Sequence, residues 1–276
     1  MSRSASDRPD GLFADPPPWL RFIIPCCFLA LLLGFWEAAV RLLSVSPLIL
    51  PPPSAILANL YENRLSLILS TWNTLLVTAE SFLLASVIGV VLAIMFSRSR
   101  LLEMAAGPLM VVTQVTPTVA IAPLVLVWVG LDHVDRAVLA LATIIAFFPI
   151  FSNTVLGLKS VNHDLQDLFT LRKASSWQRL VYLELPSALP YILSGMRIGG
   201  GLALVGAVVA EFVAGSGTAT GLAWRIVEAA NRLNTPRMFA ALVLLALLGV
   251  GISGGLALVQ HLCLRRWHES AMRRES

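Results

Sequence analysis

The residues whose chemistry could act on a solute are polar groups inside long apolar stretches. Glu80 stands near the middle of one stretch, and because a charge at the centre of a bilayer is costly, it usually faces a partner helix or a water-filled path. A helix–helix hydrogen bond, or a carboxyl packed internally, is the alternative for Glu80. Pro117 frees a backbone carbonyl in a second stretch, where polar neighbours can satisfy that carbonyl or a solute. The predicted translocation-path residues are Glu80, Thr113, Gln114, Thr116 and Asn153.

Signatures of enzymatic chemistry are missing from the sequence. Lys159 and Ser160 form its one Lys-Ser pair, but Leu158 precedes them where a phosphate-binding loop needs glycine. Neither His-Glu-x-x-His nor Gly-x-Ser-x-Gly occurs, and the three cysteines lack metal-ligand spacing. We therefore predict no catalytic residue, metal site or cofactor in this chain. Energy for active transport must come from a partner or from an ion gradient.

The elements that must position the polar groups are membrane-spanning helices. Hydrophobic residues make up 57% of the 276 residues and charged residues only 13%, whereas soluble domains carry about 25% charge. A helix needs about 20 apolar residues to cross a bilayer. The stretches of that length are residues 23–43, 68–96, 104–129, 134–158, 191–213 and 239–262. We predict an all-α polytopic bundle of about six spans, forming one domain over residues 22–264. A disordered tail is expected at 1–21 and a short tail at 265–276.

Lys and Arg residues are distributed unequally between the two sides of such a bundle. With six spans both termini share a side, and that side collects thirteen Lys and Arg residues against six on the other. Cytoplasmic segments carry the excess of positive charge. We therefore expect a multi-pass protein of the bacterial inner membrane, with both termini and the loop 159–190 in the cytoplasm.

Small residues in the stretch 191–213 predict close helix packing. Glycines about four residues apart let helix backbones approach, within one subunit or across a dimer. The predicted packing positions are Gly195, Gly199, Gly201 and Gly206. Arg197 lies among them and is expected to snorkel to the cytoplasmic interface. Ser54, which follows three prolines, is expected to cap a short helix.

The loop 159–190 contains two short amphipathic segments. Leu165, Leu168 and Phe169 follow helical spacing, and Ser175 with Gln178 forms the pattern of a capping box. The apolar side of the second segment is predicted to hold Trp177, Leu180 and Val181. The loop mixes charges of both signs, whereas a helix on a membrane surface carries a row of Lys and Arg. The pattern therefore favours contact with a partner protein.

Residues 174–178, 183–192 and 195–199 resemble the cytoplasmic signature of binding-protein-dependent ABC importer permeases. The resemblance extends over residues 47–263 and is nearest to the nitrate, sulfonate and taurine permeases and their pyrimidine-precursor relatives. It implies that the loop is a coupling helix that docks on an ATPase subunit. The positions it assigns to this loop are Asp167, Leu168, Phe169, Lys173, Ala174, Ser175, Trp177, Leu180, Leu185 and Pro186.

The same resemblance implies the function and the partners. The chain would be the permease of an importer whose separate ATPase binds ATP and Mg²⁺, and a periplasmic binding protein would deliver a sulfonate, nitrate or pyrimidine-like solute. Two copies of the permease, as a homodimer, are the expected arrangement. The chain departs from the family where Asp167-Leu168-Phe169 replaces Glu-Ala-Ala and Lys173 replaces a glycine. An ion-coupled secondary transporter that uses Glu80 is the alternative, although no internal repeat is visible.

Overall fold

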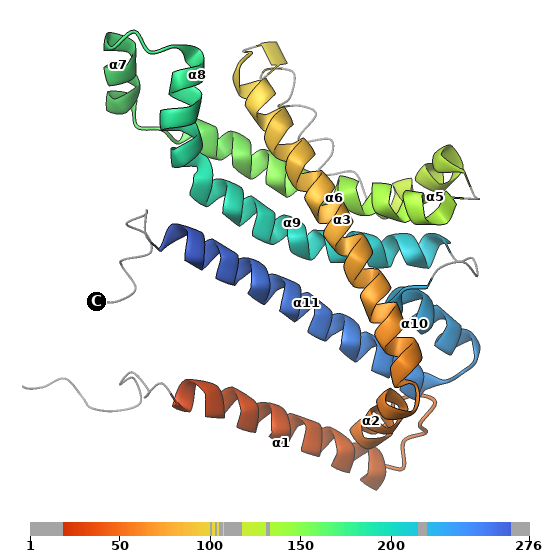
Figure 1. Cartoon of the computed structure of the whole chain (residues 1–276). Coiled ribbons are helices and arrows are strands. Elements are labelled where there is room, and N and C mark those ends of the chain that lie inside the picture. Colours follow the sequence, from red (N-terminus) through yellow and green to blue (C-terminus); the bar gives the residue numbers. More distant parts are fainter. Residues whose placement is uncertain are drawn as a thin grey trace, which may run out of the picture.

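The structure of the chain is a computed structural model that describes residues 19–99, 118–130, 133–214 and 220–265, with positions 101, 102, 104 and 107. The described residues form helices and no strand (Figure 1). These elements are α1 (Leu20–Leu42), α2 (Pro53–Glu62), α3 (Arg64–Ser97), α5 (Thr118–Val129), α6 (Val134–Lys159), α7 (His163–Leu171), α8 (Ser176–Arg179), a π-helical turn η2 (Leu180–Glu184), α9 (Leu185–Ala214), α10 (Leu222–Asn231) and α11 (Thr235–Leu264).

Five helical segments are long and apolar enough to cross a membrane, and they confirm five of the predicted spans. They are Ile23–Leu42, Arg64–Ser97, Val134–Lys159, Ser176–Val213 and Thr235–Leu264. The remaining predicted span, 104–129, is described mainly over α5, whose 12 residues are too few to cross a bilayer alone. Thr113, Gln114 and Thr116 lie outside the described residues, as do most of both predicted tails.

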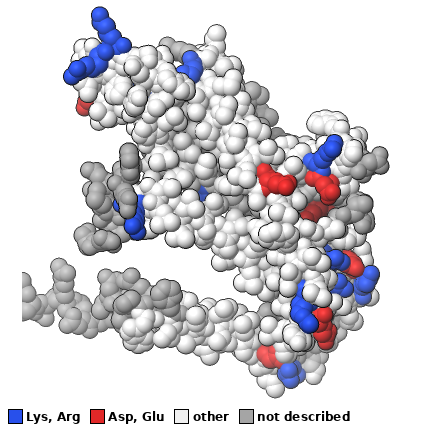
Figure 2. Space-filling view, in the orientation of Figure 1, with Lys and Arg blue, Asp and Glu red and all other residues white. Residues whose placement is uncertain are grey.

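The spans have two distinct ends (Figure 1). The start of α1 and the end of α11 lie on the same side as α7 and α8, which we call the loop end. The helices α2 and α10 lie on the opposite side, which we call the distal end. Charged side chains gather mainly toward these two ends, and the surface between them is largely uncharged (Figure 2). This distribution is the one expected of a bundle that crosses a bilayer.

The centre of the bundle is the close pair α6 and α9, which lie side by side while α3 crosses in front of them (Figure 1). A Cβ atom built on Gly195, Gly199 or Gly206 of α9 would come within 3.0 Å of a backbone atom of α6. These three glycines therefore set how closely the two helices approach. Gly201 differs, because a Cβ built there meets nothing within 4 Å. The predicted packing role of Gly201 is wrong within a single chain.

Two sequence expectations about helix starts are corrected by the structure. Helix α2 begins at Pro53, so Ser54 lies inside its first turn and does not cap it. The carboxylate of Glu37 in α1 takes that role instead, because it accepts a hydrogen bond from the Ser54 backbone N–H at 3.0 Å. The fifth span also starts earlier than predicted. Helix α9 begins at Leu185, six residues before the predicted start at 191, and Pro190 lies within it.

Candidate functional site

Helix α7 presents an exposed apolar surface at the loop end. Its N-cap is Asn162, whose side-chain oxygen accepts the backbone N–H of Asp164 at 2.9 Å. Three leucines of α7 stay exposed, namely Leu165 at 44%, Leu168 at 49% and Leu171 at 81%. No residue of α7 is buried, so this helix is held away from the bundle. An apolar helix side that stays exposed at a charged end of the molecule is typical of a protein-binding surface.

The turn that follows α7 passes through Lys173, whose φ of 51° is left-handed. The backbone N–H of Ala174 donates to the carbonyl of Phe169 at 3.0 Å, and Lys173 N–H donates to Thr170 at 3.0 Å. This arrangement ends a helix with a left-handed residue, a position where glycine is usual. The departure noted in the sequence, lysine in place of a glycine, therefore falls where the backbone favours glycine.

Helix α8 confirms the predicted capping box. Ser175 N–H donates to the side-chain oxygen of Gln178 at 2.8 Å, and Gln178 N–H donates to the Ser175 hydroxyl at 3.2 Å. Trp177 is exposed at 71%, as is Tyr182, which the sequence interpretation did not select. Leu180 is different. It is buried and packs with Leu158 of α6 beneath the loop, so its predicted place on the partner-facing surface is wrong.

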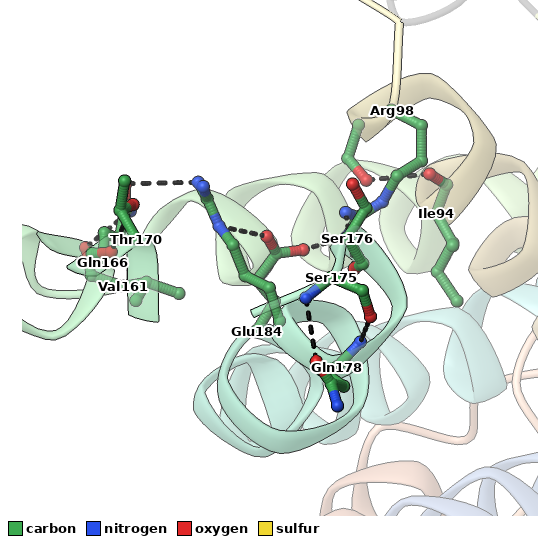
Figure 3. Close-up of polar contacts among 11 residues, drawn as sticks. Ile94, Arg98, Val161, Gln166, Thr170, Ser175, Ser176, Gln178 and Glu184 are labelled. Carbon is green, nitrogen blue, oxygen red and sulfur yellow. Dashed lines mark hydrogen bonds and ion pairs between the residues drawn. The ribbon is translucent and has the colours of Figure 1, made fainter. Parts of the chain in front are cut away.

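The residue that ties this loop to the bundle is Glu184, at the end of the π-helical turn (Figure 3). Its side chain is nearly buried and accepts hydrogen bonds from two arginines. Arg179 of α8 donates through Nε at 3.1 Å, and Arg98, at the end of α3, forms a close ion pair through Nη2. Arg179 also donates to Gln166 of α7 at 3.4 Å. The Glu184 carboxylate therefore connects α8 to α3, and Arg179 extends this connection to α7.

Sequence reasoning missed this cluster, although one signal was present. Glu184 stands between Leu183 and Leu185 in an otherwise apolar run, and a carboxylate buried among leucines needs a paired cation. The two arginines lie 86 and 5 residues away, and nothing in their local sequence marks them as its partners. The sequence interpretation used both only as markers of topology.

The described translocation-path candidates occupy different environments. Glu80 is exposed near the middle of α3, so within a single chain its carboxyl is not packed internally. Asn153 is half-buried in α6, where its side-chain amide donates to the Pro149 carbonyl at 2.8 Å. The structure does not bring these two residues into a common polar cluster. Their assignment to a solute path stays a prediction.

At the distal end a second buried carboxylate orders α10. The side chain of Glu211 accepts the backbone N–H of Ala223 at 3.0 Å, at the N-terminus of α10. A cavity of about 30 Å³ lies beside it and is lined in part by Asn73 and Asp135. Within α10, the hydrogen bond from Arg225 holds the pKa of Glu228 below its usual range, although burial acts in the opposite direction.

Comparison with known proteins identifies the chain. A family described as the inner membrane component of binding-protein-dependent transport systems matches residues 85–262, which include α9 and most of the described bundle. The chain belongs to this permease family. The matched region contains both Arg98 and Glu184, and it also contains the exposed surface of α7 and α8.

Curated relatives agree with the family. The riboflavin transport system permease RibX of Chloroflexus aurantiacus is 36% identical over 88% of this chain and 89% of its own. The formylaminopyrimidine transport permease ThiX of Halalkalibacterium halodurans is 32% identical over 82% and 88%. The taurine transport system permease TauC of Escherichia coli is 28% identical over 87% and 88%. These relatives are transport permeases and not enzymes. The chain is a permease subunit of an ABC importer, which confirms the function predicted from the resemblance.

The left-handed residue of the permease loop gives a testable expectation. Replacing Lys173 by glycine removes the steric strain of a side chain at positive φ, about 1 kcal/mol, but adds a similar entropy to the unfolded chain. We therefore expect Lys173→Gly to keep its melting temperature in detergent within 2–3 °C of the parent, roughly the shift that 1 kcal/mol produces. Lys173→Val should lower it, because a β-branched residue is disfavoured at this φ. Equal melting temperatures for the two variants would contradict this account of the turn.

Proposed function

We propose that α7 and α8 form the surface through which this permease docks on a cytoplasmic ATPase. The observation that carries the proposal is the exposed row of Leu165, Leu168 and Trp177, held by the Glu184 cluster at a charged end of the molecule. Apolar side chains in that position gain by burial against a protein, about 25 cal/mol per Å². The ion pairs fix the orientation of the loop, so that a displacement of α7 and α8 can be passed to α3.

The remaining parts of the importer follow from this arrangement. The loop end would be cytoplasmic, in agreement with the excess of Lys and Arg predicted there. The ATPase would hold ATP and Mg²⁺, and this chain would contribute no catalytic group. A second copy of the permease would complete the path, and a periplasmic binding protein would deliver solute at the distal end, where α2 and α10 lie.

Shortening the loop tests the docking surface. We expect a chain lacking residues 167–180 to insert in the membrane but to co-purify with less than a tenth of the ATPase bound by the full chain, because the exposed apolar row is removed. The double variant Leu165→Ala with Trp177→Ala provides a milder test that leaves the backbone intact. The isosteric change Glu62→Gln, at an exposed position of the distal end, is the control. Undiminished ATPase on the shortened chain would exclude α7 and α8 as the docking surface.

For the solute, we propose a neutral heterocycle in preference to an inorganic anion. Glu80 is an exposed carboxylate at membrane depth, and Asp135 and Glu211 line the small distal cavity, so an anion would meet repulsion. Two relatives with at least 32% identity are named for riboflavin and formylaminopyrimidine. In the reconstituted complex, we expect a heterocycle of this kind to stimulate ATP hydrolysis through the binding protein. Stimulation by nitrate or taurine, with none by the heterocycles, would overturn this choice.

A further inference from the structure

Arg197 lies further from the start of its helix than the sequence indicated. It is 12 residues beyond Leu185, the first residue of α9, and at 1.5 Å per residue this places it about 18 Å along the helix. The helix also continues back through η2 and α8 without a break. Arg197 therefore stands well within the helix and not in its first turns. The expectation that Arg197 snorkels to the interface stays a prediction.

Arg197 is also exposed and without a partner among the described residues. No hydrogen bond or ion pair of its guanidinium occurs there, and the same holds for the carboxylate of Glu80. Glu80 is 16 residues from the start of α3 and 17 from its end. In the described spans, these are the two charged residues that stand at least ten residues from both ends of their helix.

The face of α9 that carries Arg197 points away from the packed core. Gly195 and Gly199 pack on α6, and a step of two residues turns the helix by about 200°, so Arg197 lies on the opposite side. Gly201, one turn further on, faces open space. Ser194, one turn back on the same side, accepts a hydrogen bond from Gln260 of α11 at 3.1 Å. This face is open, small and partly polar.

Exposure to lipid would be unfavourable for such a face. An arginine at the centre of a spanning helix is unfavourable even on insertion scales that include relaxation of the bilayer. We propose that the Arg197 face of α9 lines the water-filled solute path, and that Arg197 donates hydrogen bonds to a carbonyl oxygen of the passing solute. Its planar fork of N–H donors suits such an oxygen. With Glu80 as an acceptor, the path carries one charge of each sign per chain.

This inference rests on the permease function and deepens the solute proposal. A path with one guanidinium and one carboxylate per chain selects by its pattern of donors and acceptors and not by net charge. Neutral heterocycles that carry a carbonyl beside an N–H match that pattern. An alternative use of the same charges is an ion pair between Arg197 of one copy and Glu80 of the other, and the experiments below separate the two.

Thiol accessibility tests whether the face is wet. In the assembled complex, with Cys26, Cys27 and Cys263 replaced by serine, Gly201→Cys should react with a charged, membrane-impermeant methanethiosulfonate at least tenfold faster than Val250→Cys. Val250 is a suitable control because it is 71% exposed and sits near the middle of α11, among apolar residues. A thiol in lipid stays protonated and excluded from the reagent. Equal, slow labelling of both positions would overturn the proposal.

Charge variants separate solute contact from an ion pair between copies. Arg197→Gln should abolish solute-stimulated ATP hydrolysis and leave the amount of co-purified ATPase unchanged. If instead Arg197→Glu prevented dimer assembly and the double change with Glu80→Arg restored it, the charges would pair across the copies and the solute contact would be wrong. Failure of the docking proposal would appear as undiminished ATPase co-purification in the loop variants, whereas the labelling result would be unaffected by it.

Discussion

Replacing Glu184 by alanine should reduce ATPase co-purification and solute-stimulated ATP hydrolysis by about tenfold or more. The change leaves Arg98 and Arg179 side by side without the carboxylate that both contact. Breaking a fully buried pair costs about 3–5 kcal/mol and an exposed pair at most about 1. Glu184 is 11% exposed at its side chain, and the arginines are 32% and 39% exposed, so about 2 kcal/mol is reasonable. A loss of that size corresponds to roughly a thirtyfold shift in an equilibrium.

The expected defect lies in the position of the loop and not in insertion of the chain. Glu184→Gln keeps the side-chain volume and one acceptor oxygen, so it should retain more activity than alanine, and Arg98→Ala should resemble Glu184→Ala. The matched control is Glu62→Ala, an exposed carboxylate at the distal end. The measurement is the quantity of ATPase bound per permease, together with ATP hydrolysed per solute transported. If Glu184→Ala bound as much ATPase as the parent and hydrolysed the same ATP per solute, the ion pairs of Glu184 would have no role in positioning the loop.

The sequence predicted the spans well because the bilayer imposes a simple rule. A run of about 20 apolar residues has few other uses, so five spans were found to within a few residues at most ends. The capping box at Ser175 was also predictable, because a box of four residues depends on local geometry alone. These features need no knowledge of what lies elsewhere in the fold.

The errors occurred where the tertiary structure differs from what the local sequence pattern predicts. Trp177 and Leu180 are three residues apart and were assigned to one helical face, but a π-helical turn begins at Leu180 and changes the pitch. Leu180 is consequently buried while Trp177 is exposed. Arg197 was placed less than two turns into its span because the apolar run begins at residue 191, whereas α9 begins at Leu185. In both cases the missing information was the path of the helix into the span.

The close approach of α6 and α9 predicts a large effect of one added methyl group. In Gly206→Ala the new Cβ would lie 2.7 Å from the Cα atom of Ala142, a backbone atom that cannot move without shifting α6. Overpacking of this kind costs about 1–3 kcal/mol. For a chain of this length, that loss corresponds to a fall of about 2–10 °C in the melting temperature measured in detergent.

Gly201→Ala is the matched control, because it makes the same chemical change in the same helix where the added Cβ meets nothing within 4 Å. Alanine favours a helix over glycine by up to about 1 kcal/mol, so Gly201→Ala should leave the melting temperature unchanged or raise it. The opposite signs of the two substitutions distinguish packing from helix propensity, which would act alike at both sites. If both variants had the same melting temperature, α6 and α9 would not be held at the separation that Gly206 allows. The same pair also bears on the solute path, because a rigid α6–α9 contact fixes the side of α9 from which Arg197 projects.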